Sequence, residues 1–559
     1  MSVRTALRRA MTAVAVLALA LLGFAVGPVL SAAAAPAPSD PSAQVPSQFI
    51  AKIYTEALGR LPYQSEWTSD AQTFSQAGCS LQTLADVGQQ VYTSADYAQL
   101  GYDNTSRLIT LYRGVWNSEA DDTLSSWQQA LDHGEAWSTV VARFFADPQF
   151  TDLVPKICSG ARDSSATSYA LAGKSPLPLQ TATAGFDGSQ EELQALLDDT
   201  APGGSVMLAQ RALVVLTSPL TIPNGVTLTT ADNPDPEHYA EMGRLVRGGS
   251  FDQPMVDVTN GAKLTSVWVD GARNSPGNFS PNRYDVRVLG GHGTTVTNDK
   301  ISNTAGSASI QVLGQGGGYA CSDVTVSKNV ITAYSNDHYL TRQLSDGTTA
   351  GAWSDGIASG CADTTITDNQ IVDTGGVGIS LTRGSRLPDV GVVQKSVVSG
   401  NSILSAGVSM YAGIVADPLF YVPGTGSQAR YDFSSTRIVD NTVWSGPSTH
   451  LVIGISAGSR AWYAGTAMIG ANSGHGLTVA GNTTGGVGAR VRIGIAISGM
   501  SAVRLGVNPA DWIHSGVPGK QGNACPTADV AAAVSAGDAA DLQTDQPYTD
   551  VSFDGCMGE

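Results

Sequence analysis

Basic residues are scarce in this chain. Its 559 residues include 31 Lys and Arg against 48 Asp and Glu, which gives a formal net charge of −17 and an isoelectric point near 4.7. A nucleic-acid-binding protein needs a basic surface for the phosphates, so the composition argues against that partner. It does not exclude an acidic polysaccharide, because a local group of Arg or Lys side chains can outweigh the mean charge.

Long apolar runs are also scarce. The single one extends from about residue 10 to residue 26, after Arg4, Arg8 and Arg9, and small residues follow it at 31–35. This order is typical of a secretory signal over residues 1–35, with a membrane anchor as the alternative. No later stretch is long and apolar enough to span a bilayer. We therefore expect a secreted, extracellular protein with no membrane partner after signal cleavage.

Charged residues make up only 14% of the chain, whereas Gly and Pro number 63 and 26. That composition favours many tight turns and few helices. Six segments share one frame, in which a β-branched residue comes three positions before a polar turn residue and Ile or Val usually follows. The turn residues are 30, 40, 32, 40 and 41 positions apart, and they are Asp299, Asn329, Asn369, Asn401, Asn441 and Asn482. A short strand, a turn and a short strand repeated at this spacing indicate a solenoid.

A second series of strands supports the same stack. It contains Ile310 and then Gly-Ile pairs whose Ile residues are Ile357, Ile379, Ile414, Ile455 and Ile495. We expect each Ile to point inward and the Asn side chains to form a structural ladder at the turn, where Asn tolerates the left-handed backbone region. The outward positions beside these Ile residues are mostly Gly, Ser or Ala, so they would form a floor of small side chains.

The start of the solenoid carries a family resemblance. Ser189 and the acidic residues after it begin a predicted helix over 189–199, followed by Pro202-Gly-Gly and a strand at 220–228. This order, together with Val267-Trp-Val-Asp-Gly-Ala-Arg273, resembles pectate-lyase-like right-handed parallel β-helix proteins. The resemblance implies a mainly β chain, with the helix plugging a β-helix over 185–516 and a second cap at 517–559.

The cysteine count is even, as expected in an oxidising compartment. Cys321 and Cys361 each stand five residues before the start of a frame, so stacking brings them within disulfide reach. By domain logic Cys79 would pair with Cys158, and Cys525 with Cys556. A metal site is the alternative, but Cys-x-x-Cys and paired His spacings are missing.

Residues 48–158 show apolar residues at helical spacing in two similar copies. Leu58-Gly-Arg-Leu-Pro62 and the closing Ser94-Ala-Asp-Tyr97 resemble a small helical repeat domain of unknown function found in bacterial secreted proteins. The linkers would be 36–47 and 159–184. We expect the Tyr and Trp stripe of this domain to be core, with carbohydrate contact as the alternative.

Chemistry is expected in insertions that flank the Gly-Ile strands, at 334–353, 383–391, 417–434 and 458–474. A cleft walled by them would suit a long polysaccharide, because flat aromatic faces pack against sugar rings. The expected substrate-binding residues are Trp353, Tyr421, Tyr431, Trp462 and Asp417. The alternative is that the aromatics only anchor the insertions.

Candidate catalytic residues come from the same cleft. Trp353-Ser-Asp355-Gly resembles the Asn-Thr-Asp-Gly motif of polygalacturonase-type hydrolases, which implies a carboxylate role for Asp355. The paired acids of that family fall in Thr374-Gly-Gly376-Val377-Gly-Ile, which has no carboxylate. Gly474-His475-Gly476 lies beyond Ile455, which is itself three Gly-Ile coils from Ile357, so that mechanism is doubtful. A lyase would instead need a base and cations, which His338 and Arg383 could supply. The catalytic candidates are Asp355, Asp337, His338, Arg342 and Arg383.

These patterns predict a monomeric protein that acts on an extracellular or cell-wall polysaccharide as a lyase or hydrolase. The alternative is a non-catalytic glycan-binding matrix or adhesion protein. No cofactor and no metal are expected, and calcium is the one ion left open.

Overall fold

The structure is a computed structural model. It describes residues 45–159, 176–179, 181–249, 251–273, 279–314, 319–333, 354–382, 393–417, 431–447, 449, 451–457, 474–484, 491–497, 500–501 and 504–506. All of these residues belong to one compact unit. Within them, no helix is both long enough and apolar enough to cross a membrane.

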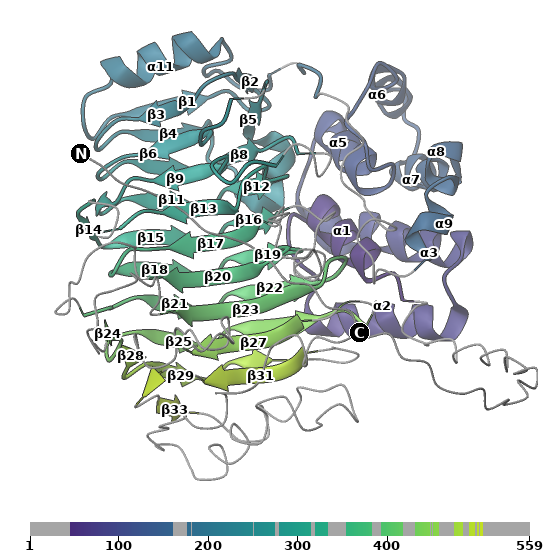
Figure 1. Ribbon diagram of the computed structural model, residues 1–559. Coiled ribbons are helices and arrows are strands. Elements are labelled where there is room, and N and C mark those ends of the chain that lie inside the picture. The colour runs from purple at the N-terminus through teal and green to yellow at the C-terminus, as the bar shows by residue number, and fades with distance from the viewer. Residues whose placement is uncertain are drawn as a thin grey trace, which may run out of the picture. The chain divides into compact units, whose positions relative to one another are not determined.

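Three stacked parallel sheets, here called A, B and C, confirm the predicted right-handed parallel β-helix (Figure 1). Each coil contributes one short strand to each sheet. Sheet A consists of β1 (Ser205–Leu208), β4 (Thr227–Thr230), β7 (Lys263–Thr265), β11 (Thr295–Thr297), β15 (Val324–Ser327), β18 (Thr364–Thr367), β21 (Val397–Ser399), β25 (Arg437–Val439), β29 (Thr478–Ala480) and β33 (Arg504–Gly506). Sheet B consists of β2 (Leu213–Leu216), β5 (Gly243–Arg247), β8 (Val267–Asp270), β12 (Lys300–Ser302), β16 (Val330–Thr332), β19 (Gln370–Val372), β22 (Ser402–Ser405), β26 (Thr442–Ser445) and β30 (Thr483–Thr484). Sheet C consists of β3 (Leu220–Ile222), β6 (Val256–Val258), β9 (Val286–Val288), β13 (Ala308–Val312), β17 (Asp355–Ser359), β20 (Val377–Thr382), β23 (Met410–Asp417), β27 (Leu451–Ala457) and β31 (Val491–Ile497).

Two small parallel sheets lie between the C and A strands of the chain. One pairs β10 (Gly291–His292) with β14 (Cys321–Ser322). The other contains β24 (Tyr431–Asp432), β28 (Gly474–His475) and β32 (Met500–Ser501).

The turn between sheets A and B carries the predicted Asn ladder. The Nδ2 of Asn369 donates to the Oδ1 of Asn401 at 2.9 Å, and the Nδ2 of Asn401 donates to the Oδ1 of Asn441 at 2.8 Å. The same pattern continues from Asn329 and as far as Asn482. Each ladder Asn also bonds backbone groups, so these side chains hold the coils in register and are structural.

The predicted position of the left-handed residue in this turn is wrong by one residue. The left-handed residue is the one before each ladder residue, namely Asn298, Lys328, Asp368, Gly400, Asp440 and Gly481, with φ between 55° and 67°. Asn is therefore selected at the ladder position for its side-chain amide, which both donates and accepts.

The first rung of the ladder is a carboxyl group. The Oδ1 of Asp299 accepts a bond from the Val267 N–H at 2.9 Å, whereas its Oδ2 makes no hydrogen bond within the described part of the chain. Burial raises the pKa of Asp299 well above its ordinary value. The native state therefore favours the protonated carboxyl, and the contribution of Asp299 to stability is lost as pH rises through the raised pKa.

Replacing Asp299 with Asn should raise the free energy of unfolding at pH 7 by about 1–3 kcal/mol, because the new amide would extend the ladder without a buried charge. The advantage should shrink as pH falls toward about 4, the ordinary pKa of an Asp carboxyl. Urea unfolding across this pH range measures the effect. The matched control is Asp187→Asn at an exposed position, and a destabilised Asp299→Asn protein would contradict the argument.

Sheet C contains the predicted Ile stack. Ile310, Ile357, Ile379, Ile414 and Ile455 pair in register, and each is fully buried in the solenoid core. Stacked equivalent side chains bury apolar area on every coil, which contributes about 25 cal/mol per Å².

The glycines of this series do not form the expected outward floor. A Cβ on Gly378 would lie 2.7 Å from both the Gly413 carbonyl oxygen and the Cγ2 of Ile403, a core side chain of sheet B. Gly356, Gly413 and Gly454 have equivalent neighbours. The row is glycine because the packed interior and the next coil leave no room for a side chain.

The N-terminal end of the β-helix is capped by α11 (Gln190–Asp199), as predicted. Its capping box joins Ser189 and Glu192, and Leu193 and Leu197 are buried in the solenoid core. Gln194 accepts from the Thr221 N–H and donates to the Thr221 carbonyl, so the helix satisfies the open edge of sheet C.

Two of the three predicted disulfides are confirmed. Cys321 and Cys361 are bonded on consecutive coils with their Cα atoms 5.6 Å apart. Cys79 and Cys158 are bonded with a Cα separation of 5.5 Å. Cys525 and Cys556 lie outside the described residues.

The N-terminal helices pack together and against the outer face of sheet B (Figure 1). Their bounds are α1 (Ser47–Ala57), α2 (Gln64–Ala77), α3 (Leu81–Tyr92), α4 (Ala95–Gln99), α5 (Asn104–Gly114), α6 (Leu124–Asp132), α7 (Trp137–Ala146), α8 (Pro148–Thr151) and α9 (Val154–Ile157). Sheet B meets them with Trp268, Val372, Leu404 and Trp444, all of which are buried in the same hydrophobic cluster.

The aromatic stripe of the helices is core, as predicted. Trp67 and Tyr112 are fully buried, and Tyr97 stacks on Trp137 with 5.6 Å between ring centroids. The helices and the solenoid thus share one hydrophobic interface, although the predicted domain boundaries themselves stay a prediction.

Candidate functional site

Asp355, the central catalytic candidate, begins β17 and is half-buried. Its Oδ1 accepts a bond from the Val377 N–H of the next coil at 2.7 Å. The carboxylate therefore helps to start the adjacent C strand. A catalytic role for Asp355 stays a prediction.

Asp417, a predicted substrate-binding residue, ends β23 and pairs with Thr382. Asp355 begins its strand and Asp417 ends its own, two strands farther along sheet C. By register the two positions are five residues apart along the strands, which is about 16 Å. The backbone does not bring these two acids together at one bond.

The other predicted cleft residues are mostly outside the described part of the chain. Tyr431 begins β24, where its backbone pairs with Gly474. The remaining candidates lie outside the described residues: Asp337, His338, Arg342, Trp353, Arg383, Tyr421 and Trp462.

The outer face of sheet C presents one row of side chains in register along the solenoid. Its members are Thr221, Asp257, Arg287, Gln311, Ala358, Ser380, Val415 and Ser456. Ser380, Val415 and Ser456 are buried, whereas Thr221, Arg287, Gln311 and Ala358 are partly exposed. The partly exposed members therefore lie on β3, β9, β13 and β17, with the buried Asp257 of β6 among them. We call this part of the row, from β3 to β17, the C face.

The centre of the C face is an ion pair. Arg287 donates from Nε and Nη2 to the two carboxylate oxygens of Asp257 at 2.7 and 2.8 Å. This hydrogen-bonded pairing raises the pKa of Arg287, so the guanidinium stays charged at any physiological pH. Its geometry is fixed by two bonds and by two neighbouring strands.

An amide and a phenol flank this pair. The Nε2 of Gln311 donates to the carbonyls of Val312 and Ala358, which leaves its Oε1 as an acceptor on the partly exposed side chain. Tyr319 follows β13 and is 37% exposed, and its hydroxyl contributes to the raised pKa of Arg287. Charged, amide and phenolic groups beside one another can hydrogen-bond the hydroxyls of a sugar chain.

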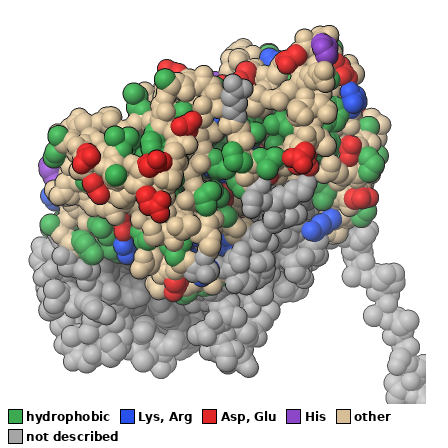
Figure 2. All heavy atoms as spheres, turned by 90° about the horizontal axis from the view of Figure 1, so that it is seen from above, with side chains coloured by type: hydrophobic (Ala, Val, Ile, Leu, Met, Phe, Trp, Pro, Cys, Tyr) green, Lys and Arg blue, Asp and Glu red, His purple; other side chains and the backbone are tan. Residues whose placement is uncertain are grey.

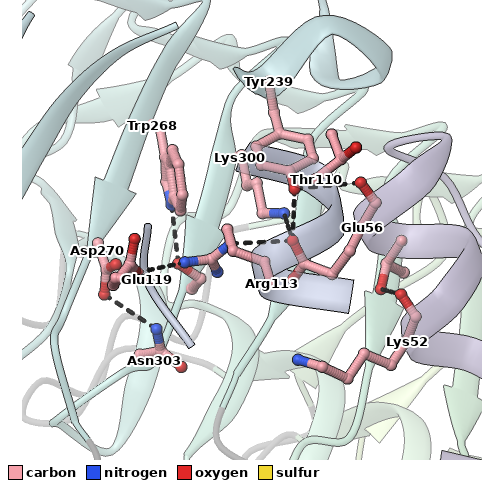
Figure 3. Close-up of polar contacts among 12 residues, drawn as sticks. Lys52, Glu56, Thr110, Arg113, Glu119, Tyr239, Trp268, Asp270, Lys300 and Asn303 are labelled. Carbon is pink, nitrogen blue, oxygen red and sulfur yellow. Dashed lines mark hydrogen bonds and ion pairs between the residues drawn. The ribbon is translucent and has the colours of Figure 1, made fainter. Parts of the chain in front are cut away.

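A second charged constellation was not predicted, and it lies between the N-terminal helices and sheet B (Figure 3). Glu56 of α1 accepts from Arg113 of α5 at 3.0 Å and from Lys300 of β12 at 3.2 Å. Glu119 then links two arginines. Its Oε1 lies 2.5 Å from the Nη1 of Arg113 and 2.8 Å from the Nη2 of Arg244 in β5.

This series of alternating acidic and basic side chains ends on sheet B, where Arg244 also pairs with Asp270. Trp268 lies between the arginines, with its ring centroid 3.9 Å from the Arg244 guanidinium carbon and 4.5 Å from that of Arg113. Tyr239 donates to Glu56 at 2.6 Å. We call this set of residues the ionic interface.

In the ionic interface, burial sets the direction of the pKa shift for the lysines, whereas the ion pairs set it for the carboxylates. It lowers the pKa of Lys300 to about 7 and that of Lys52 to about 8, although Glu56 opposes both shifts. Burial would raise the pKa of Glu56, but Arg113, Lys300 and Lys52 together hold it well below the ordinary range. Every carboxylate in the set is engaged by a cation, so the arrangement joins helices to strands and leaves no carboxylate of the set without a partner.

Acidic side chains are spread over the surface that lies above the view of Figure 1 (Figure 2). This distribution fits the negative net charge and opposes binding of a polyanion there. Among the described residues, no group of three or more His, Cys, Asp or Glu side chains is placed to hold a metal ion. Calcium therefore stays a prediction for the insertions.

No family model matches the chain, and no curated protein sequence matches it. Among solved structures, endo-xylogalacturonan hydrolase from Aspergillus tubingensis is 12% identical with a TM-score of 0.35, over 57% of this chain and 88% of that one. PfbA, a surface adhesin of Streptococcus pneumoniae, is 11% identical with a TM-score of 0.33, over 54% and 77% of the two chains. A tailspike protein mutant of E. coli bacteriophage HK620 in complex with pentasaccharide is 12% identical with a TM-score of 0.35, over 57% and 59%. The β-helix assignment rests on the strand pairing of this chain.

Proposed function

We propose that the protein is an extracellular glycan-binding β-helix protein, and that an extended polysaccharide lies across the C face. The observation that carries the proposal is the in-register row of Asp257, Arg287 and Gln311, with Tyr319 exposed beside it. Adjacent parallel strands are about 4.8 Å apart, so β3 to β17 span about 19 Å. That length suits several sugar units of one chain.

Cleavage of the bound glycan, as a lyase or hydrolase, is the second candidate function. It would draw its acid, base and cations from the insertions that flank the C strands. The bond from the Val377 N–H to Asp355 favours binding over cleavage, because it commits part of that carboxylate to the fold.

Affinity electrophoresis of the mature protein in gels that contain neutral or uronic-acid polysaccharides tests the binding proposal. We expect retardation by at least one glycan class. Assays for new reducing ends and for ultraviolet absorbance of unsaturated products, on the same panel, separate a hydrolase, a lyase and a binder. A protein that no glycan retards would overturn the proposal.

Replacing Arg287 with Ala should weaken retention by the recognised glycan about tenfold, since one lost charge-assisted hydrogen bond costs about 1.5 kcal/mol or more. Tyr319→Ala should also weaken it, through lost contact with a sugar ring. Arg437→Ala is the matched control, because Arg437 is exposed on sheet A. Equal losses in all three variants would point away from the C face.

A further inference from the structure

The charge at the centre of the C face is balanced within the protein itself. Asp257 on β6 accepts from the Nε and Nη2 of Arg287 on β9 at 2.7 and 2.8 Å, with one carboxylate oxygen for each nitrogen. The side chain of Asp257 is only 10% exposed, whereas that of Arg287 is 30% exposed. The buried acid therefore neutralises the base, and the base is the member of the pair that a ligand can reach.

A second ion pair repeats this arrangement just before the same two strands. Asp252 precedes β6 and Arg283 precedes β9, and the Oδ1 of the acid lies 3.7 Å from the Nε of the base. Arg247 lies nearby, but it is buried and its Nη atoms donate to backbone carbonyls. Each of the two arginines on and before β9 is thus paired with an acid of the preceding coil.

The C face offers a ligand hydrogen bonds without a net charge. Arg287 has five N–H donors, and in the described part of the chain its pairing uses two of them, which leaves three. Gln311 keeps its Oε1 as an acceptor, and the hydroxyl of the partly exposed Tyr319 can donate and accept. Sugar hydroxyls also donate and accept, so a neutral glycan can use all of these groups.

A carboxylate on the glycan would gain little from the same guanidinium. It would approach Arg287 while Asp257 stays within hydrogen-bond distance of that group, so repulsion from the acid offsets most of the attraction to the base. Asp355, at the start of β17, is a further acidic residue of sheet C. The net charge of −17 on the whole chain also opposes a polyanion at longer range.

We propose that the polysaccharide bound on the C face is a neutral one, and that Asp257 sets this preference by neutralising Arg287. This inference rests on the proposed binding of a glycan to the C face. It disfavours uronic-acid polymers, because their carboxylates need a cation whose charge is not already compensated. Asp257 acts through Arg287 and is therefore a positioning residue, which fixes both the orientation and the charge balance of the guanidinium.

Affinity electrophoresis with glycans of matched backbone tests the preference. Each neutral glycan of the panel is compared with the same polymer oxidised to the acid at C6, and each uronan with its carboxyl-reduced form. In every pair that retards the protein, we expect the dissociation constant of the neutral member to be at least about tenfold lower. Equal or tighter binding of the acidic member would overturn this proposal and leave glycan binding itself intact. A protein that no member retards would overturn glycan binding, and this proposal with it.

The variant Asp257→Asn tests the role of the acid. It keeps the size of the side chain but leaves the charge of Arg287 uncompensated, so affinity for the acidic member of a pair should rise at least about tenfold. A structural defect alone would weaken the binding of both members. The matched control is Asp122→Asn, which removes the same charge at an exposed position before α6 and should keep the wild-type preference. An unchanged preference in folded Asp257→Asn would overturn the role of Asp257.

The salt dependence of wild-type binding gives a test that needs no variant, and it decides the charge of the ligand even if Asp257→Asn does not fold. Salt screens attraction between opposite charges but has little effect on hydrogen bonds to neutral sugars. We therefore expect the dissociation constant for the recognised glycan to change less than about twofold between about 50 and 500 mM NaCl. A larger loss of affinity across this range would contradict a neutral ligand.

Discussion

Replacing Glu56 with Ala should lower the free energy of unfolding at pH 6–7 by about 3–5 kcal/mol, the usual cost of removing one partner from a buried ion pair. Glu56 is the shared acceptor of Arg113, Lys300 and Tyr239. Without it, the Arg113 guanidinium remains charged inside the interface between helices and sheet. Urea unfolding followed by tryptophan fluorescence and by far-ultraviolet circular dichroism measures the loss.

The loss should depend on pH in a defined direction. The pKa of Lys300 is lowered to about 7 and that of Lys52 to about 8, from an ordinary value near 10.5. A lysine whose pKa is depressed in the fold binds fewer protons there than in the unfolded chain, so its burial penalty falls as pH rises through the depressed pKa. The deficit of Glu56→Ala should therefore be largest below pH 7 and smaller at pH 9, where both lysines can be neutral.

The shape of the transition should also change. In the wild type we expect the helices and the solenoid to unfold together, because they share the ionic interface and one hydrophobic cluster. In Glu56→Ala the circular dichroism signal of the helices should be lost at lower urea than the sheet signal. Glu135→Ala is the matched control, since Glu135 pairs with a half-exposed Arg143 at the surface and should cost at most about 1 kcal/mol. A deficit of that size in Glu56→Ala would mean that the ionic interface does not hold the helices.

The repetitive part of the fold could be predicted because its information is local and periodic. Each Asn of the ladder and each Ile of sheet C occupies the same place in its own frame, so one coil predicts the next. The pairing of Cys321 with Cys361 follows from the same register. The left-handed position could not be assigned by residue type alone, because Lys328 and Asp368 occupy it as well as Gly400.

The ionic interface could not be predicted in this way because its members come from six separate segments without a common period. One signal was present in the strands. Sheet B carries apolar residues on both faces at Ile371-Val372, Ile403-Leu404 and Val443-Trp444. A strand that is apolar on both sides is buried on both sides, which predicts a covering layer. The charged residues Lys300 and Arg244 on the same outer face predict that the cover carries partners for them.

Two glycines of the solenoid are required because α1 packs closely against them. A Cβ on Gly407 would lie 2.1 Å from the Gln48 amide nitrogen, and one on Gly446 would lie 2.3 Å from the Ser47 Oγ. Both helix residues are at the start of α1, and both glycines are in turns that follow sheet B strands. From the sequence alone these glycines cannot be told from ordinary turn glycines. The contact that requires them is with a segment more than 300 residues away in the chain.

The catalytic and substrate-binding residues stay predictions, because most of them lie in insertions outside the described residues. The lengths and contents of these insertions differ from coil to coil, so one coil does not predict the next. The C face was missed for another reason. The expected floor of small side chains began at the coil of Ile310, whereas the polar row begins on earlier coils, at Asp257 and Arg287, and ends at Gln311. An alternation of apolar and charged residues in Val256-Asp257-Val258 and Val286-Arg287-Val288 was the signal for it.

Replacing Asn401 with Ala should destabilise the solenoid by about 3 kcal/mol or more, although the change removes no charge and little apolar surface. Asn401 accepts from the backbone and side-chain amides of Asn369 at 3.0 and 2.9 Å. It donates to the carbonyls of Ile366 and Ser399 and to the Oδ1 of Asn441. The truncation therefore leaves several buried polar groups without partners, each at about 1–3 kcal/mol, partly offset by relaxation or by an entering water.

The Asn401→Asp variant separates the ladder's hydrogen bonds from its shape. Its carboxyl keeps the acceptor for Asn369 but has no amide to donate to the Ile366 carbonyl, and at pH 7 a buried negative charge would face the Asn441 Oδ1. We expect a larger loss than for Ala at pH 7 and a smaller one near pH 4, where protonation restores one donor. Urea unfolding at both pH values measures these losses, with Asn282→Ala at an exposed position as the control. A loss of less than about 0.5 kcal/mol in Asn401→Ala would mean that the Ile stack alone sets the register.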